Sequence, residues 1–172
     1  MMSLEPRSHG LLARFSRLSG AEAALLAEAM LVLAFSSAAI RFLPFAQVGR
    51  LASRRLGRAR RGPVEGLAGE VAWAVQACAR RVPWRAVCFQ QGLASQIMLR
   101  RRGVDSTLYF GAAMGAESEL AAHVWVKAGP IEIVGCREAA GFAVLATYPP
   151  APGWRPQSNR IAGRGHFDPI RS

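Results

Sequence analysis

The spacing of apolar residues changes once along this chain, from the period of a helix to the period of a strand. Over residues 64–82 and again over 88–103, apolar side chains recur every three or four residues, which predicts two amphipathic helices. Residues 106–112 are rich in strand-forming types, and the alternation in 122–127 followed by a turn and 131–134 predicts a hairpin. Helices followed by a small antiparallel sheet make an α+β fold.

An apolar segment precedes these helices, from residue 21 to residue 40. Glu22 and Glu28 interrupt it, and the longest uncharged run, 29–40, would span about 18 Å as a helix against a hydrocarbon thickness of about 30 Å. A membrane-spanning or cleaved segment is therefore the least favoured interpretation. We expect a helix that is buried or faces a partner, with contact at a membrane surface as the alternative.

Arginines are concentrated after this segment, in a chain whose formal net charge is +11. Arg50, Arg54 and Arg58 are four residues apart, which predicts one basic face of a helix. A solvated surface helix is the favoured interpretation. The alternative is a non-catalytic basic scaffold that binds an acidic peptide, nucleic acid or a membrane surface. No aromatic residue lies between Arg50 and Arg61, so a stacking platform for single-stranded nucleic acid is not supported.

Missing motifs argue against several classes of function. Three cysteines are too few and too scattered for a disulfide framework. There is no CxxC, HExxH or paired-histidine motif for zinc, and we expect neither a metal nor another cofactor. There is also no GxxxxGK[ST] or GxGxxG loop, which argues against an autonomous nucleotide-binding enzyme.

Cys88 is predicted to lie in the first turn of the second helix, after a loop at Pro83, and the arginines before Gly103 mark the end of that helix. The first turn of a helix has unpaired backbone N–H groups and the positive end of the helix dipole, which stabilise a thiolate and the oxyanion of an acyl intermediate. Cys88 is therefore a candidate nucleophile. Cys78 falls on the apolar face of the first helix and is interpreted as a core thiol.

His123 is the candidate general base. It is the histidine that lies within a predicted element, because His9 and His166 fall near the ends of the chain. Taken alone, a strand histidine is more often a core residue than a catalyst. A cysteine at a helix start followed by a histidine on a strand is, however, the arrangement of cysteine acyl-transfer enzymes.

Two segments carry a family resemblance. One is VPWRAVC, which ends at Cys88 and is followed by LA and MLRRRGV, and the other is AHVWV around His123. Over residues 64–147 they resemble the lasso-peptide B-proteins, the leader peptidases of microcin-type lasso peptides. The resemblance implies a transglutaminase-like, papain-like core in which a helix bearing Cys88 packs on a small sheet bearing His123. It also implies that Cys88 attacks the carbonyl that follows the leader, with His123 as the base.

The third member of a catalytic triad is left open. Members of that family often have an aspartate about twelve residues after the histidine, a position occupied here by Gly135. Whether the hairpin pairs His123 with residue 135 or 136, Glu132 lies about 13 Å along the strand from His123. A backbone carbonyl, a water or the Glu138 carboxylate are the alternatives. We therefore predict a Cys88–His123 dyad.

Other residues are candidates for lining the site. Cys136 falls opposite His123 in one hairpin register and would add a second thiol. Gln91 is a candidate amide donor to an oxyanion. Trp84 and Trp125 either wall the cleft or pack in the core.

The expected organisation has three parts: a helical region with a basic segment over 1–63, the peptidase core over 64–148 and a tail rich in proline and glycine over 149–172. Residues 1–63 lack the strand pattern of the PqqD-like winged-helix domain that recognises leaders in this family. The resemblance therefore implies a lasso precursor peptide as substrate, a separate PqqD-like recognition protein and an ATP-dependent cyclase. We expect no nucleic-acid partner and a cytoplasmic protein, whose helix over 21–45 is the candidate surface for a partner or a membrane.

Overall fold

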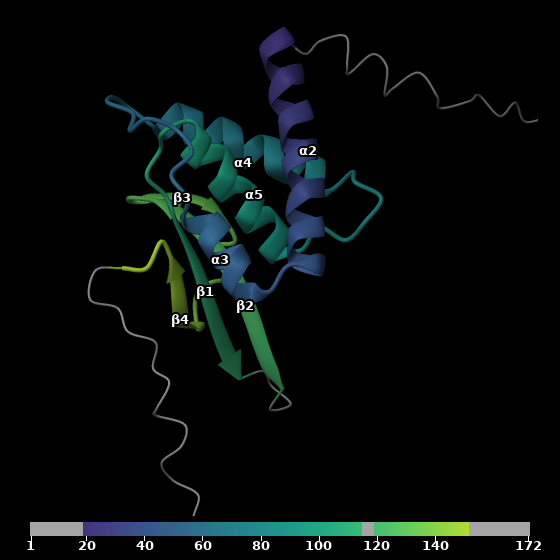
Figure 1. Ribbon diagram of the computed structural model, residues 1–172, viewed down its shortest axis with the longest axis vertical. Helices are drawn as coiled ribbons and strands as arrows, with labels where there is room; N and C mark the ends of the chain where they lie inside the picture. Colours follow the sequence, from purple (N-terminus) through teal and green to yellow (C-terminus); the bar gives the residue numbers. More distant parts are fainter. Residues whose placement is uncertain (1–18, 115–118, 152–172) are drawn as a thin grey trace, which may run out of the picture.

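The computed structural model describes residues 19–114 and 119–151, and the predicted α+β fold is confirmed. Within these residues the helices precede one antiparallel sheet of order β3-β2-β1-β4 (Figure 1). The elements are α2 (Gly20–Phe42), α3 (Phe45–Ser53), α4 (Glu65–Ala79), α5 (Cys88–Arg101), β1 (Thr107–Met114), β2 (Leu120–Ala128), β3 (Ile131–Val134) and β4 (Ala143–Tyr148). Strand β4 was not predicted from the sequence. His9, His166 and most of the predicted tail lie outside the described residues.

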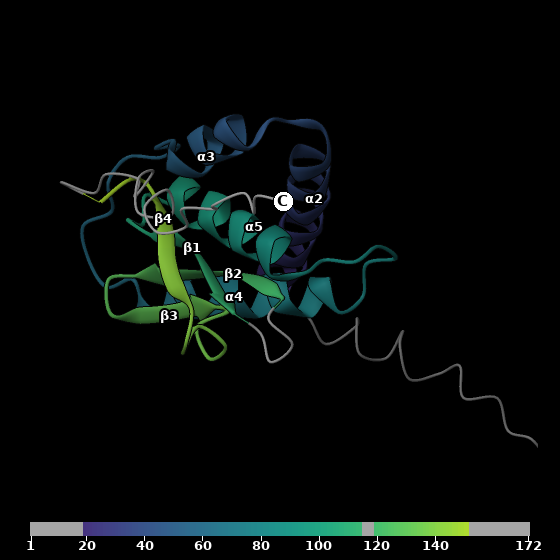
Figure 2. The same ribbon diagram turned by 90° about the horizontal axis from the view of Figure 1, so that it is seen from below.

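Helix α5 is the central element. It contacts α2, α3 and α4 as well as strands β1, β2 and β3. Figure 1 shows α5 between α2 and the sheet, and Figure 2 shows α3 and α4 on opposite sides of it. Its residues from Gly92 to Arg100 are all buried as a result. The helix ends as predicted, because Gly103 takes a left-handed conformation with φ +73°, which favours glycine after a helix.

Two buried polar side chains of α5 bind the carbonyl groups of neighbouring segments. The amide nitrogen of Gln96 shares its two N–H groups among the carbonyls of Ala52 (3.1 Å), Ser106 (3.0 Å) and Tyr148 (2.8 Å). Arg100 Nη1 donates to the same Ser106 carbonyl at 2.9 Å. A buried carbonyl without a partner costs about 1–3 kcal/mol, so these bonds hold the ends of α3, β1 and β4 against the central helix.

Helix α2 begins with a capping box. The Glu22 N–H donates to Ser19 Oγ at 3.2 Å, and the Ser19 N–H donates to the Glu22 carboxylate at 2.8 Å. One side of the helix packs on α4 and α5 through Ala29, Val32, Leu33, Ser36 and Ala39. By length and composition α2 is also the one helix among the described residues that is long and apolar enough to cross a membrane.

Glu28 joins α2 to the end of α5. Its carboxylate accepts from Arg102 Nη1 at 3.0 Å and also binds Arg102 Nη2, while Arg101 Nη1 lies 3.0 Å from Oε1. The hydrogen bonds from Arg102 lower the pKa of Glu28. Of the two acidic residues that interrupt the apolar segment, Glu28 is therefore part of a tertiary contact, and Glu22 belongs to the cap of α2.

The prediction of a basic helical face is wrong. Helix α3 ends at Ser53, before most of the arginines, and the chain is irregular from there to α4. The Arg54 carbonyl accepts from Arg100 Nε at 3.0 Å, and the Arg60 N–H donates to the Gly103 carbonyl at 2.9 Å. These bonds to the end of α5 take the place of a further helical turn.

The predicted hairpin is confirmed, with one difference in register. Strands β2 and β3 are joined by a two-residue turn, and Lys127 Nζ binds Glu132 Oε1 at 3.2 Å. A bulge then shifts the pairing so that Val126 lies opposite Val134. The pairing ends there, so His123 lies beyond the last pair of the hairpin.

Glu28→Gln tests the contact between α2 and α5. We expect the free energy of unfolding to fall by about 1–2 kcal/mol at pH 7, because bonds from a charged donor to this carboxylate, which is 20% exposed, are weakened. Since the folded-state pKa of Glu28 is lowered, its contribution is complete above the ordinary carboxyl pKa of about 4.3 and is lost as the pH falls through the folded-state pKa. Urea unfolding at pH 7 and pH 3 measures both effects.

The matched control is Glu70→Gln, an exposed carboxylate on α4. We expect it to change the unfolding free energy by no more than about 0.5 kcal/mol at either pH. Equal losses in the two variants, or a loss in Glu28→Gln that is undiminished at pH 3, would contradict the contact.

Candidate active site

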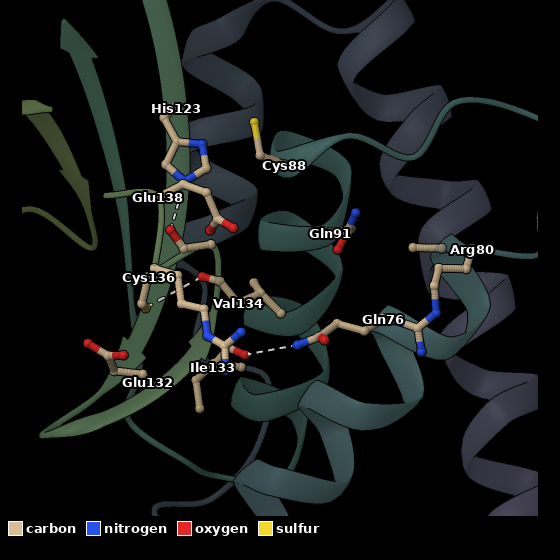
Figure 3. Close-up of a pocket in the computed structure, with 13 residues that line it drawn as sticks. Gln76, Arg80, Cys88, Gln91, His123, Glu132, Ile133, Val134, Cys136 and Glu138 are labelled. Carbon is tan, nitrogen blue, oxygen red and sulfur yellow. Dashed lines mark hydrogen bonds between the residues drawn. The ribbon is translucent and has the colours of Figure 1, made fainter. Parts of the chain in front are cut away.

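A cavity of about 700 Å³ lies between the helices and the edge strand β3 (Figure 3). The end of α4 and the start of α5 form one side, and β3 with the loop after it forms the other. Its lining residues are Gln76, Ala79, Arg80, Cys88, Gln91, His123, Glu132, Ile133, Val134, Gly135, Cys136, Arg137 and Glu138. Cys88 and His123, which come from different elements, therefore border the same space.

The fold places Cys88 at the first position of α5. Val87, at the N-cap, makes no side-chain cap, so no cap side chain occupies the N–H groups of the first turn. The Gln91 side chain donates to the Ala86 carbonyl at 2.7 Å and so holds the loop before the cysteine. The thiol is half-buried and opens onto the cavity. A nucleophile here is accessible and lies at the positive end of the helix dipole.

His123 is held by its far ring nitrogen. Nε2 lies 2.7 Å from the Gly135 carbonyl, which can only accept, so Nε2 carries the proton and Nδ1 has a free lone pair in the neutral ring. Figure 3 shows the ring with its Nδ1 edge toward the Cys88 sulphur. Trp125 stacks beside the imidazole at a centroid distance of 6.0 Å, and Phe142 lies against it at 5.1 Å. These contacts fix the ring in an orientation that suits a general base.

The carbonyl of Gly135 occupies the place where the resemblance leads one to expect an aspartate. The residue has φ +71°, and a Cβ added to it would lie 2.5 Å from the Val124 carbonyl oxygen and 3.1 Å from His123 Nε2. A side chain does not fit there without moving the backbone or the imidazole. Of the alternatives that the sequence left open, the backbone carbonyl is the one that the structure places on the ring.

Cys136 and Glu138 also line the cavity, but the hydrogen bond that the His123 ring makes within the described part of the chain is to the Gly135 carbonyl and to neither of them. The Cys136 thiol donates to the Val126 carbonyl at 3.3 Å, at the bulge of the hairpin, and burial raises its pKa. The Glu138 side chain is exposed and reaches the cavity from the loop after β3. Cys136 therefore remains a thiol near neutral pH, and Glu138 contributes a charge to the rim.

The two tryptophans do not line the cavity. Trp125 is 5% exposed, and it stacks on Tyr109 with ring centroids 5.5 Å apart. Trp84 is half-buried in the loop before α5. Of the two interpretations of Trp125, core packing is the one that the structure shows, and through that packing it supports His123.

The remaining cysteine is a core thiol, as predicted. Cys78 is 3% exposed, its sulphur donates to the Leu26 carbonyl at 3.4 Å, and burial raises its pKa. Among the described residues there is also no group of three or more His, Cys, Asp or Glu side chains that would hold a metal ion.

The fold and the cavity define an α+β protein in which a cysteine at the start of a central helix faces a histidine on an antiparallel sheet. The family model of the transglutaminase-like superfamily matches residues 29–147, more than half of the chain. The chain belongs to the transglutaminase-like superfamily, which includes cysteine peptidases. The match begins inside α2, so α2 and α3 lie largely within the family domain. No curated protein and no solved structure matches the chain significantly.

Gly135→Ala tests the bond that orients His123. We expect a loss of stability of about 1–2 kcal/mol from the left-handed backbone, with a further loss from the contacts to Val124 and the imidazole. We also expect the imidazole to lose its fixed tautomer. Ring ¹⁵N NMR of the neutral histidine should show a protonated Nε2 and a bare Nδ1 in the wild type, and a mixture of tautomers in the variant.

Gly129→Ala is the matched control, because its φ is +59° and a Cβ there meets no heavy atom within 4 Å. It should lose stability from the backbone alone and keep the Nε2-protonated tautomer of His123. An unchanged tautomer in Gly135→Ala, or the same change in Gly129→Ala, would argue against the carbonyl as the orienting group.

Proposed function

We propose that this protein is a cysteine peptidase that removes the leader from a lasso-peptide precursor before a partner cyclase closes the macrolactam ring. Membership in the transglutaminase-like superfamily supports the peptidase class. The resemblance of the VPWRAVC and AHVWV segments to the lasso-peptide B-proteins supports the substrate. The observation that carries the chemistry is the 2.7 Å contact from His123 Nε2 to the Gly135 carbonyl, because it leaves Nδ1 to act on Cys88.

The first step forms an acyl-enzyme. His123 Nδ1 accepts the thiol proton, and the Cys88 sulphur attacks the carbonyl carbon of the scissile peptide bond. Backbone N–H groups in the first turn of α5 stabilise the negative charge that develops on the carbonyl oxygen. The imidazolium then gives its proton to the leaving nitrogen as the C–N bond breaks. The core peptide leaves with a free amine, and the leader remains as a thioester on Cys88.

The second step restores the enzyme. His123 Nδ1 takes a proton from a water molecule, whose oxygen attacks the thioester carbonyl. The C–S bond breaks, the imidazolium returns the proton to the sulphur, and the leader leaves with a free carboxylate. In both steps the ring becomes positively charged, and the Gly135 carbonyl stabilises this charge by accepting from Nε2–H.

The partners follow from the same resemblance. We propose that a separate PqqD-like protein presents the leader in the cytoplasm and that an ATP-dependent cyclase receives the core peptide. Residues 19–63 form the helices α2 and α3 and contain no strand. Because a PqqD-like domain contains strands, we expect the isolated chain to bind a leader weakly. The outer side of α2, where Leu31 is 72% and Phe42 77% exposed, is the proposed surface for a partner, with a membrane surface as the alternative.

Cleavage of a precursor tests the function. The full chain is combined with the short peptides encoded beside its gene and with any PqqD-like protein encoded there, and the products are weighed by mass spectrometry. We expect one cut, with product masses that sum to the precursor plus one water. Cys88→Ala and His123→Ala should each lower the rate by at least about 10³-fold, as for other nucleophile–base pairs.

Cys136→Ser is the control, because it changes the other thiol of the cavity and should retain cleavage within a few-fold. Full cleavage by Cys88→Ala would refute the assignment of the nucleophile. A leader product joined to an amine, instead of one that has gained water, would replace hydrolysis by acyl transfer.

A further inference from the structure

The cavity beside Cys88 is bordered by the backbone edge of a strand. Strand β3 ends the order β3-β2-β1-β4, so within the sheet it pairs on one side only, with β2. Its residues Glu132, Ile133 and Val134 all line the cavity. Because side chains of a strand alternate between two faces, a cavity lined by consecutive residues borders the edge of that strand.

One carbonyl of this edge is directed away from β2. The Ile133 oxygen accepts from the Gln76 amide on α4 at 3.5 Å, across the lower part of the cavity in Figure 3. The residues on either side of it, Glu132 and Val134, pair with β2. A separation of 3.5 Å is at the limit of a hydrogen bond, so a closer N–H donor would be a better partner for this carbonyl.

The charges of the cavity do not select a substrate by sign. Its charged lining residues are Arg80, Glu132, Arg137 and Glu138, whose formal charges cancel, and all four are exposed. Exposed charges add little to affinity, whereas the strand edge offers main-chain hydrogen bonds that do not depend on the charge of the substrate.

We propose that an extended segment of the peptide substrate binds in this cavity as an additional strand beside β3. In this arrangement a peptide N–H replaces the Gln76 amide on the Ile133 carbonyl. Addition of a strand to a sheet edge is a general mode of peptide recognition, in which main-chain hydrogen bonds supply affinity. The cavity continues from Ile133 past Glu138 to His123 and Cys88, so a strand bound there brings its next peptide bond to the sulphur. The inference rests on the proposed peptidase function and defines how that peptidase holds its substrate.

Disulfide tethering to Cys88 tests this binding mode without a known substrate. The full chain carrying Cys136→Ser is equilibrated in a 2-mercaptoethanol buffer with two probes, acetyl-Ala-Ala-Ala-Cys-amide and acetyl-Cys-Ala-Ala-Ala-amide, which extend to opposite sides of the sulphur. We expect one of them to form a mixed disulfide about tenfold more stable than that of N-acetylcysteine methylamide, the effect of one or two main-chain hydrogen bonds. N-methylation of alternate alanines should remove this gain, and N-methylation of the alanines between them should not.

Hydrogen exchange of the tethered protein locates the peptide. Amides of β3 should gain protection, and amides of β4, at the other edge of the sheet, should not. Gln76→Ala should retain the tenfold gain, because the peptide displaces that amide. The inference is overturned if neither probe exceeds the N-acetylcysteine control, if N-methylation acts equally at every position, or if protection falls on β4.

The two proposals fail separately in these experiments. Tethering needs only an accessible Cys88 thiol, so a chain that binds the probe with the alternating pattern but cuts no precursor contradicts the peptidase function alone. A chain that cuts the precursor but shows no alternating pattern contradicts only the proposal that the substrate binds as a strand beside β3.

Discussion

Helix α5 is buried from Gly92 to Arg100, and the positions of the other elements depend on that burial. Apolar contacts surround the helix, while Gln96 and Arg100 bind the carbonyl groups of the segments that pass its sides. The Glu28–Arg102 pair joins α2 to the C-terminal end of α5. Burial begins one turn after Cys88, so the same packing that holds the helix leaves its first residue half-buried at the border of the core. A cysteine in this position is rigidly supported and still reaches solvent.

The position of the histidine depends on where a strand stops. The pairing between β2 and β3 ends at Val126, before His123, and the left-handed Gly135 then directs its carbonyl to the imidazole. A carbonyl acceptor fixes the tautomer as an aspartate would. It carries no full charge, and hydrogen bonds to neutral acceptors are about half as strong as those to ionised ones. We therefore expect the imidazolium to be stabilised less here than in a triad with a carboxylate.

Elements with a strong local signal were predictable from the sequence. Helices α4 and α5 and the β2–β3 hairpin follow from periodicity. Pro83 separates the two helices and Gly103 marks the end of α5, because the backbone preferences of these residues act locally. Cys88 and His123 became candidates because their residue types and positions in these elements are chemically informative. The other features depend on tertiary contacts. The arginines after Ser53 leave the helix because the end of α5 offers hydrogen bonds to their backbone, and β4 is a short strand that forms by pairing with β1.

The group that orients His123 was also not predictable from the sequence alone. The twelve-residue offset pointed to position 135, but a glycine there carries no side chain to interpret. A backbone carbonyl becomes a functional group through its direction, which is set by φ and by the end of β3 rather than by residue type. The role of Trp125 was also ambiguous from the sequence. The alternation along the strand indicates which face of the sheet the side chain lies on, but not whether that face borders a cavity or packs on another ring.

The Cys88–His123 dyad is tested by the rate at which iodoacetamide modifies each cysteine between pH 5.5 and pH 9, in the wild type and in His123→Ala. Burial raises the pKa of both Cys78 and Cys136, so these two should react slowly at neutral and acidic pH. At pH 6 we expect Cys88 to react at least about tenfold faster than either, and this selectivity to be lost in His123→Ala. Equal rates at the three cysteines in the wild type, or an unchanged rate at Cys88 in the variant, would contradict a Cys88–His123 dyad.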